Sequence, residues 1–313
     1  MIPKYNQSNY NVLAHTYSIV ARDPKTGEMG VGVQSHYFNV SVVAWGESGL
    51  GVVATQSFIN KSFGLRGLEL LKQGNSPEEV LKILLSDDDG KDVRQVAILD
   101  VQGSVATHTG SKCIKYAGHK IGDNFSVQAN LMLSDQVWPT MAEAYISYKN
   151  LPLPERIIKT LEAAESVGGD IRGMQSAALL IVGGEPIENK WEEPLIDLRV
   201  EDHKQPLKEL NRLLKLYRAY EHMDYGDQAV EKDDVNKALK EYNAAMEMFP
   251  DNLEMKYWTA VSLANSQKLD DALQIFKDVF KKDNNWRLLT ERLPEVELLK
   301  LKKEDLHKIL SLK

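Results

Sequence analysis

The sequence predicts a domain of the α+β class, organised as a layered αββα sandwich, followed by an all-α region of helical repeats. Segments with strand character and segments with helix character occur in blocks, and not in the βαβ alternation of a doubly wound sheet. From about residue 206 the pattern is helical throughout, and an internal period of 34 residues appears there. A chain of 313 residues has room for about two domains of this size.

The strand signals open the chain. Residues 16–21 (TYSIVA) are rich in β-branched and aromatic side chains. Turn residues at 23–27 and a second run at 29–34 follow them, which predicts a hairpin. A second strand pair is expected at 40–44 and 50–56. Later apolar runs predict further strands at 95–100, 105–108, 176–182 and 195–200.

Helix signals fill the intervals between these strands. Leucines recur through residues 64–72. Ser76 begins a second helix as its N-cap, with Pro77 at the first helical position and acidic residues in the first turn. Two more helices are expected at 135–148 and 153–166. This order of elements is typical of an α+β or αββα arrangement.

The region after residue 206 contains an internal repeat. Ala238 and Tyr242 recur 34 positions later as Ala272 and Phe276. This period, with a small residue and an aromatic residue four apart, resembles a tetratricopeptide repeat (TPR). We therefore expect an N-terminal extension, an αββα domain and a TPR-like domain whose groove binds a protein partner, with bounds at 1–15, 16–214 and 215–313.

The composition is that of an acidic globular protein. The net charge is −7, which disfavours binding to nucleic acid or to an anionic membrane surface. The single cysteine, Cys113, cannot form an intramolecular disulfide. The N-terminal segment has no apolar core of a signal peptide, and no apolar run is long enough to span a membrane. A cytoplasmic location is therefore expected.

Classical cofactor and phosphate-binding motifs are missing from the sequence. It contains no GxGxxG motif after a strand, no Walker A motif and no HExxH or GxSxG motif. His108, Cys113 and His119 lie closest together among the histidine and cysteine residues, but their spacing is loose and no CxxC motif accompanies them. We therefore predict neither a cofactor nor a bound metal.

The segment from Thr107 to Cys113 (THTGSKC) collects hydroxyl, imidazole and thiol groups directly after a strand. Two interpretations stay open. The segment is either a strand-end loop whose side chains satisfy backbone groups, or one wall of a functional site. A nucleophilic pair of Cys113 with His108 is a further candidate, although no third, orienting residue is apparent.

Thr16 is the first residue of the first predicted strand and is the strongest candidate for a nucleophile. A threonine hydroxyl needs an adjacent base. Cleavage between His15 and Thr16 would supply that base as a new α-amine, whose ordinary pKa is about 8. The alternative is that Thr16 is simply a β-branched residue in a strand.

Five blocks occur in order along the first two-thirds of the chain. They are TYSIVARDPKTGEMGVGVQSHYF, GLGVVATQSFINKSFGLRGLELL, VRQVAILDVQGSVATHTGSKCIKYAGHKIGDNFSVQANLM, GGDIRGMQSAALLIV and LIDLRVEDHKQPLKEL. These blocks resemble family 1028 of the domains of unknown function (DUF1028), over about Thr16 to Leu214. The resemblance implies the fold of the N-terminal-nucleophile (Ntn) hydrolases, a four-layered αββα sandwich, and amide-bond hydrolysis with the strand-opening threonine as nucleophile and its own amine as base.

The same resemblance and the polar segments above mark candidate site residues. The candidate catalytic residues are Thr16, His108 and Cys113. The candidate substrate-binding residues are polar side chains in the matching blocks, namely Ser35, Thr55, Gln56, Asn60, Thr109, His119, Gln128, Asn130, Asp170, Arg172 and Gln175.

Two features depart from the family pattern. Ala129 stands where relatives usually carry glycine, so a backbone with positive φ at this position would be strained. Relatives begin near the threonine, whereas fifteen residues precede Thr16 here. The α-amine mechanism therefore requires cleavage of the His15–Thr16 bond.

Three functional hypotheses follow from the sequence. In the first, the protein hydrolyses a small amide or peptide at Thr16, and the helical region recruits a partner or shapes a homo-oligomer. In the second, the αββα domain is a catalytically inactive scaffold, and its pocket and the TPR groove bind partners. In the third, the same pocket binds a small molecule without turnover.

Overall fold

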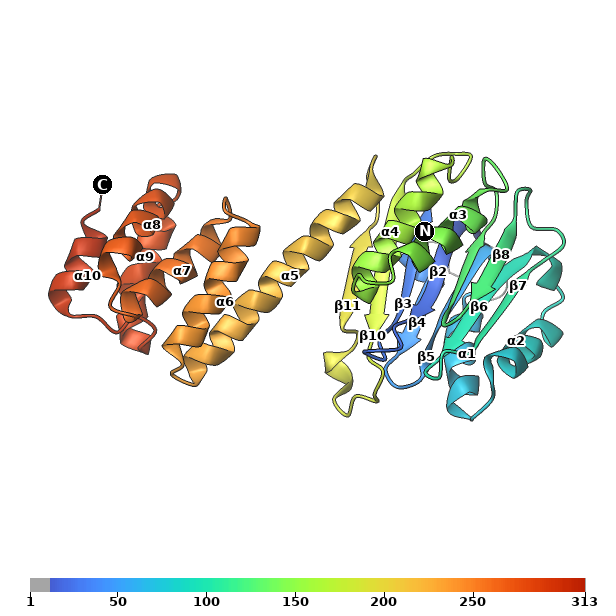
Figure 1. Cartoon of the computed structure of the whole chain (residues 1–313), viewed down its shortest axis with the longest axis horizontal. Helices are drawn as coiled ribbons and strands as arrows, with labels where there is room; N and C mark the ends of the chain where they lie inside the picture. The colour runs from blue at the N-terminus through green and yellow to red at the C-terminus, as the bar shows by residue number, and fades with distance from the viewer. Residues whose placement is uncertain (1–11, 313) are drawn as a thin grey trace, which may run out of the picture. The chain divides into compact units, whose positions relative to one another are not determined.

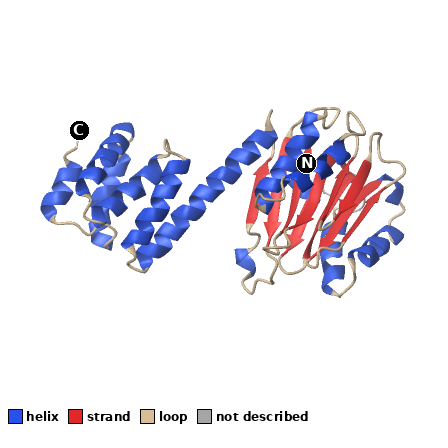
Figure 2. Ribbon diagram, viewed as in Figure 1, coloured by secondary structure: helices blue, strands red, loops and turns tan. Residues whose placement is uncertain are grey.

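The structure, a computed structural model, describes residues 12–312. The chain divides into two compact units, one up to Arg212 and one from Leu213 onward. The first unit contains two antiparallel β-sheets with helices beside them, and the second is helical (Figures 1 and 2). The protein is therefore of the mixed α+β class, with many of its helices in the C-terminal part.

The first sheet has five strands. Its order is β1–β5–β6–β7, and β4 also pairs with β5. All of these pairings are antiparallel. The strands are β1 (Val12–Ala14), β4 (Ala44–Glu47), β5 (Gly51–Ile59), β6 (Arg94–Asp100) and β7 (Val105–Thr109).

The second sheet has six strands in the order β11–β10–β3–β2–β9–β8, again all antiparallel. In the central hairpin of β2 and β3, Thr16 lies opposite Ser35. The strands are β2 (Thr16–Arg22), β3 (Met29–Ser35), β8 (Gly118–Gly122), β9 (Phe125–Ala129), β10 (Ser176–Val182) and β11 (Ile196–Val200).

The two sheets bury a common apolar core. Val20 and Val31 of the second sheet belong to the same buried cluster as Val52, Ala97 and Leu99 of the first. Successive strand residues point to opposite faces, so every second residue of these strands enters this layer. Each fully buried aliphatic side chain here contributes roughly 1.5–3 kcal/mol.

Helices pack on each sheet. Helices α1 (Ser62–Lys72) and α2 (Pro77–Ser86) lie on the first sheet, where Phe63 and Leu84 join the buried cluster of Val53 and Val96. Ser76 caps α2 as the sequence predicts, in a capping box with Glu79. Helices α3 (Val137–Ser147) and α4 (Leu153–Ser166) belong to the second sheet.

Glycine permits close approach between α4 and the second sheet. A Cβ atom on Gly32 of β3 would lie 2.2 Å from Cγ2 of Ile157 in α4. Ile157 and Leu161 are fully buried. The glycines that weaken strand propensity in this hairpin therefore make room for a helix.

The structure corrects some of the predicted elements. Residues 40–43 of the strand predicted at 40–44 form a short 3-10 helix (Val40–Val43), and only Ala44 is extended, as the first residue of β4. Asn39 before it has φ 53, a left-handed conformation that asparagine tolerates, and this breaks the extended chain. The strands β1, β8 and β9 were not predicted from the sequence. They have three to five residues each, too few for a clear alternating pattern.

The second unit is built from consecutive helices. Asp234 and Asn252 cap α6 and α7 through their side chains. Among the described residues, no helix has both the length and the apolar character needed to cross a membrane. The helices are α5 (Pro206–Glu231, which begins in the first unit), α6 (Val235–Met248), α7 (Leu253–Asn265), α8 (Leu269–Lys282), α9 (Asn285–Arg292) and α10 (Lys303–Leu310), and a 3-10 turn spans Leu293–Val296. Two further 3-10 turns, Lys91–Val93 and Lys190–Glu192, lie in the first unit.

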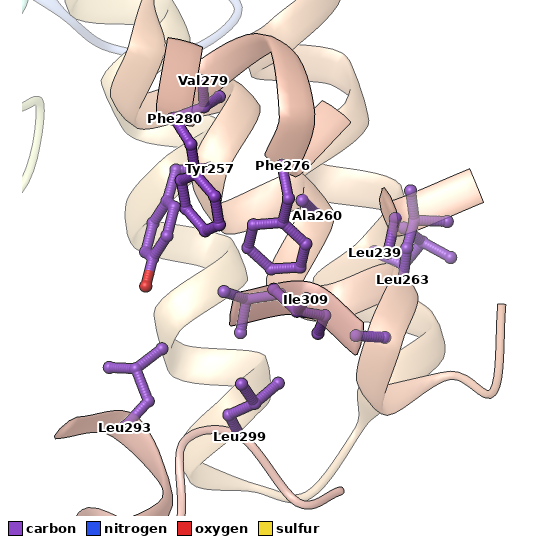
Figure 3. Close-up of a cluster of buried hydrophobic side chains, with 13 residues drawn as sticks. Leu239, Tyr257, Ala260, Leu263, Phe276, Val279, Phe280, Leu293, Leu299 and Ile309 are labelled. Atoms are coloured by element: carbon purple, nitrogen blue, oxygen red, sulfur yellow. The ribbon is translucent and has the colours of Figure 1, made fainter. Parts of the chain in front are cut away.

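The residues of the 34-residue period lie in the core of this unit. Ala238 and Tyr242 of α6 are buried, as are Ala272 and Phe276 of α8. Phe276 packs with its ring edge towards Tyr257 at 5.8 Å between ring centroids (Figure 3). A further step of 34 residues leads from Ala272 and Phe276 to Leu306 and Leu310, but this equivalence does not hold in α10, where Ile309 is the fully buried residue and Leu306 is only partly buried.

Candidate active site around Thr16

Thr16 stands where the chain passes from one sheet to the other. Ala14 pairs with Ser57 in the first sheet, and Thr16 pairs with Ser35 in the second. The His15–Thr16 peptide bond therefore lies in the crossing between the sheets. Thr16 and Ser35 are completely buried, and His15 is 3% exposed.

The carbonyl oxygen of His15 accepts two side-chain hydrogen bonds. The Ser35 hydroxyl donates to it at 2.6 Å, and Nη2 of Arg172 donates at 2.9 Å. The Thr16 hydroxyl, on the other side of the same peptide bond, donates to the carbonyl oxygen of Ala14 at 2.8 Å. Two donors on one carbonyl oxygen are the arrangement that stabilises an oxyanion when a nucleophile adds to the carbonyl carbon.

Asp170 orients the Arg172 guanidinium. Nη2 and Nε of Arg172 donate to Oδ2 and Oδ1 of Asp170 at 2.7 and 3.0 Å. The Asp170 side chain is fully buried, whereas that of Arg172 is 31% exposed. This two-point ion pair holds the planar guanidinium in one orientation and leaves Nη2 directed at His15.

The imidazole of His15 is held by Asn130. Nδ1 of His15 lies 2.7 Å from Oδ1 of Asn130. The Asn130 amide nitrogen donates to the Thr16 carbonyl and to Oε1 of Gln95, so its oxygen is the acceptor and Nδ1 carries the proton. Burial lowers the pKa of His15 below its usual value, and the Arg172 charge adds to this effect, while Asn130 opposes it. The ring is therefore neutral at pH 7.

A buried network of amide side chains extends from this point. Gln56 donates to the Thr16 carbonyl at 3.1 Å and to Oε1 of Gln95 at 2.7 Å. Ser18 donates to Oε1 of Gln56 at 2.6 Å, and Gln128 donates to the Ser18 hydroxyl at 2.6 Å. All of these side chains are fully buried. Because a buried polar group without a partner is costly, the network fixes the backbone around Thr16.

Gln95 connects this network to an open pocket of about 610 Å³. Gln95 donates to the Thr109 hydroxyl at 2.8 Å, which lies 2.8 Å from Nδ1 of His119. Burial, followed by the neighbouring charge of His108, lowers the pKa of His119. Cys113, Lys115 and Trp138 are further residues of the pocket lining.

The structure does not join Cys113 and His108 by a hydrogen bond. The Cys113 thiol donates to the carbonyl oxygen of Arg94 at 3.4 Å, and Nε2 of His108 lies 2.9 Å from the carbonyl oxygen of Lys91. Burial raises the pKa of the Cys113 thiol, an effect that the Ser57 hydroxyl partly opposes. A thiol in this state is a weak nucleophile at neutral pH.

Three other candidate residues lie outside the hydrogen-bond network around Thr16. Thr55 neighbours Gln56 on β5, so its side chain points to the opposite face of the sheet. Asn60 accepts hydrogen bonds from the backbone and hydroxyl of Ser62 at the start of α1. Gln175 donates to Asp202 at 3.1 Å through its side chain, and its backbone amide donates to the Ser35 carbonyl.

The site contains residues that the sequence did not single out. The His15 side chain, Gln95 and Ser18 are central to it. The sequence did contain one signal for such residues, namely a polar residue at an inward-facing position of an otherwise apolar strand. Gln95 in the run QVAILD is an example. Ala129 of β9 does not have positive φ, and it pairs with Tyr17 of β2. The backbone strain considered for an alanine at this position is therefore absent. Leu131, two residues later, has φ 61.

No group of three His, Cys, Asp or Glu side chains between residues 12 and 312 is placed to hold a metal ion. The site is instead defined by hydroxyl, amide, imidazole and guanidinium groups around one peptide bond. Fold and site together define the class, a two-sheet α+β protein with a buried threonine at a strand opening.

Comparisons with known proteins give the family. The "Family of unknown function (DUF1028)" matches residues 16–210, so the chain belongs to this family. The match begins at Thr16. The crystal structure of protein SPO2555 from Silicibacter pomeroyi, whose title also names DUF1028, is similar with a TM-score of 0.58 and 29% sequence identity. The similarity covers 64% of this chain and 85% of that chain. The search of curated proteins gave no match.

Proposed function

We propose that the first unit is an amide hydrolase of the Ntn type, and that Thr16 becomes its nucleophile after cleavage of the His15–Thr16 bond. The observation that carries this proposal is the pair of donors, Ser35 and Arg172, on the carbonyl oxygen of His15. Donors of this kind contribute about 10²–10³-fold each to acyl transfer.

The proposed cleavage begins with a transfer of the His15 acyl group from the Thr16 nitrogen to the Thr16 hydroxyl. Its oxygen adds to the carbonyl carbon of His15 and loses its proton to water, while Ser35 and Arg172 stabilise the oxyanion. Expulsion of the Thr16 nitrogen, which takes up a proton, leaves His15 as an ester on Oγ1. Water then hydrolyses this ester to a carboxylate on His15 and restores the Thr16 hydroxyl. The products are a free peptide and a chain that begins with Thr16.

The new α-amine then acts as the base for the neighbouring hydroxyl. An α-amine has a pKa of about 8, so roughly a tenth of it is free to accept a proton at pH 7, and this fraction rises as the pH approaches 8. A small amide or peptide substrate places its carbonyl oxygen where the His15 carbonyl lies now. An acyl-enzyme on Thr16 forms, the amine leaving group departs, and water releases the acid.

Two further findings support this proposal. The family match begins at Thr16, so the preceding segment is an addition to the family's core. The two sheets enclose one apolar layer, and helix pairs pack on each of them, an arrangement compatible with the αββα sandwich of Ntn hydrolases. The rival function is a catalytically inactive scaffold, and the completely buried, acylated state of Thr16 in this chain favours it.

The deciding experiment is the intact mass of the purified protein, with N-terminal sequencing. We expect a chain that begins at Thr16, and the same product from Thr16→Ser. Thr16→Ala should stay uncleaved and should lose hydrolysis of a panel of amino-acid amides and p-nitroanilides. A wild-type chain that stays intact on prolonged incubation and hydrolyses nothing would refute the mechanism and leave the scaffold function. Hydrolysis that survives in Thr16→Ala would also refute it, because the activity would then belong to another site.

The second unit is, we propose, a TPR-like domain that recruits a protein partner. The support is the burial of the equivalent pairs Ala238 with Tyr242 in α6 and Ala272 with Phe276 in α8. One repeat cannot bury its own apolar face, so neighbouring repeats stack and share a continuous core. Deletion of residues 269–313 should therefore expose apolar surface and lower the solubility of the chain.

A further inference from the structure

The helical unit contains a concave pocket of about 610 Å³. Residues of α5, α6 and α7 form its walls, and the segment that follows α9, from Val296 to Lys300, closes one side. This volume lies within the range of about 300–1,000 Å³ that is typical of ligand pockets. The pocket lies within one unit of the chain.

The floor of the pocket is apolar and rigid. Ala238 and Tyr242 are buried there, and Trp258 lines the wall. Tyr242 donates to Oδ1 of Asp227 at 2.6 Å, which fixes its ring. A Cβ atom on Gly226 would lie 2.3 Å from that ring, so glycine lets α5 approach α6 closely at this point.

The rim of the pocket is acidic. Four of its lining residues carry carboxylates, namely Asp227, Glu231, Asp233 and Glu297, whereas Lys300 is the one basic residue in the lining. Lys300 forms an ion pair with Asp233 at 2.9 Å. The excess negative charge at the rim attracts a cation and repels an anionic ligand.

Ser262 supplies an independent sign of a ligand. It lines the pocket and is 3% exposed, and its hydroxyl has no hydrogen-bond partner within the part of the chain that the structure describes. A buried hydroxyl without a partner is unfavourable unless a ligand or water satisfies it. The pocket therefore offers one hydrogen-bonding group between its apolar floor and its acidic rim.

The closing segment is held in place but leaves an apolar surface uncovered. The Asn265 side chain donates to the Leu298 carbonyl and accepts from the Lys300 backbone amide, both at 2.9 Å. Val296, at the edge of the pocket, is nevertheless 64% exposed. An apolar group that is presented at the mouth of a pocket is typical of a binding surface.

We infer that this pocket binds a peptide segment of a partner protein in which a lysine or arginine is flanked by apolar side chains. The cationic head meets Glu231 and Glu297 at the rim. The apolar neighbours of that side chain cover Val296 and pack against Trp258, whose ring face also favours a cation. The Ser262 hydroxyl accepts or donates one hydrogen bond to the peptide. This inference does not depend on chemistry at Thr16.

A library of random peptides displayed on phage, selected on the full chain, tests the inference. We expect the enriched peptides to carry lysine or arginine between apolar residues. Replacement of that lysine by norleucine in a synthetic copy should weaken binding, and added salt should do the same. Enrichment of acidic or uncharged peptides, or no enrichment at all, would overturn the inference.

Variants of the chain test whether the selected peptide binds in this pocket. Glu231→Lys combined with Glu297→Lys should lower the affinity of the chain for the selected peptide about tenfold, because two exposed charge attractions become repulsions. The matched control is Glu247→Lys combined with Glu291→Lys, two exposed carboxylates outside the pocket, and it should leave affinity unchanged. Equal affinity for both double variants would refute the assignment of the site.

The Ser262→Ala variant distinguishes an effect on peptide binding from an effect on the stability of the fold. Its hydroxyl has no partner in the described structure, so the variant should unfold at the same temperature as the wild type or slightly above it. Its affinity for the selected peptide should fall about threefold to tenfold, the effect of one hydrogen bond. A Ser262→Ala chain with unaltered affinity would remove this residue from the proposed contact.

Discussion

Ser35 and His15 are joined by a hydrogen bond of 2.6 Å from the Ser35 hydroxyl to the His15 carbonyl oxygen. The register of the β2–β3 hairpin, in which Thr16 lies opposite Ser35, creates this contact. A slip of one residue would turn the Ser35 side chain to the other face of the sheet. The hairpin thus positions a donor at the bond that must break if Thr16 is to become a nucleophile.

Loss of this donor should slow cleavage of the chain. We expect Ser35→Ala to reduce the rate of cleavage at His15–Thr16 by about 10²-fold, since one of two oxyanion donors is removed. Mass spectrometry of freshly purified protein over time gives the rate. Ser126→Ala is the matched control, because Ser126 is equally buried and hydrogen-bonded but does not contact His15. An equal effect of both variants would point to general destabilisation.

The burial of His15 should make the first unit less stable in mild acid. The pKa of His15 in the folded chain lies below 6.5, so the unfolded chain takes up a proton first as the pH falls. Stability is therefore lost as the pH drops below 6.5. In the uncleaved Thr16→Ala background, we expect His15→Gln to reduce the difference in urea midpoint between pH 7.5 and 5.5. An unchanged difference would assign the acid sensitivity to other groups.

The buried Tyr17 contacts the half-buried Glu165 on the helix-facing side of the second sheet. The Tyr17 hydroxyl donates to Oε1 of Glu165 at 2.6 Å. Glu165→Ala should cost about 1–3 kcal/mol of unfolding free energy, because it leaves a buried hydroxyl without a partner. Glu165→Gln keeps an acceptor and serves as the control. Equal losses in both variants would contradict this explanation.

The same pair predicts a dependence on pH. Burial is the main cause that raises the pKa of Glu165 above 4.5, so the folded chain binds this proton more tightly than the unfolded chain. The stability from the protonated carboxyl is present at low pH and is lost as the pH rises through the folded pKa. The stability of Glu165→Gln relative to the wild type should therefore increase as the pH rises above 4.5. Urea unfolding between pH 4 and 7 measures this trend, and a flat difference would exclude it.

Gly32 should be intolerant of substitution. Its missing side chain leaves the space that Ile157 fills, with 2.2 Å between the added Cβ and Cγ2 of Ile157. Gly32→Ala should lower the free energy of unfolding by roughly 1–3 kcal/mol, the usual cost of overpacking. Gly183→Ala is the control, since its nearest neighbour would lie at 3.4 Å, an ordinary contact distance. Similar losses for both variants would show that helix α4 adjusts freely.

Local sequence patterns predicted most of the long elements. Ser76 is the N-cap of α2 as expected, and the structure adds its capping box with Glu79; such a cap involves only four consecutive residues, so a local pattern predicts it. The change to helices after residue 206 also appears in the structure. Short strands such as β8 and β9 escaped prediction, since neighbouring strands determine them more than their own composition does.

The sequence by itself determined that Thr16 opens a strand and that a helical region with a 34-residue period follows, because both depend on neighbours along the chain. Only the tertiary structure decided which side chains surround the His15–Thr16 bond. Ser35, Asn130 and Arg172 meet there from distant parts of the chain, through strand register and the face-to-face packing of two sheets. Hydrogen bonds over such separations produce no periodic pattern in a sequence, so the roles of Gln95 and of the His15 side chain were visible only in the folded chain.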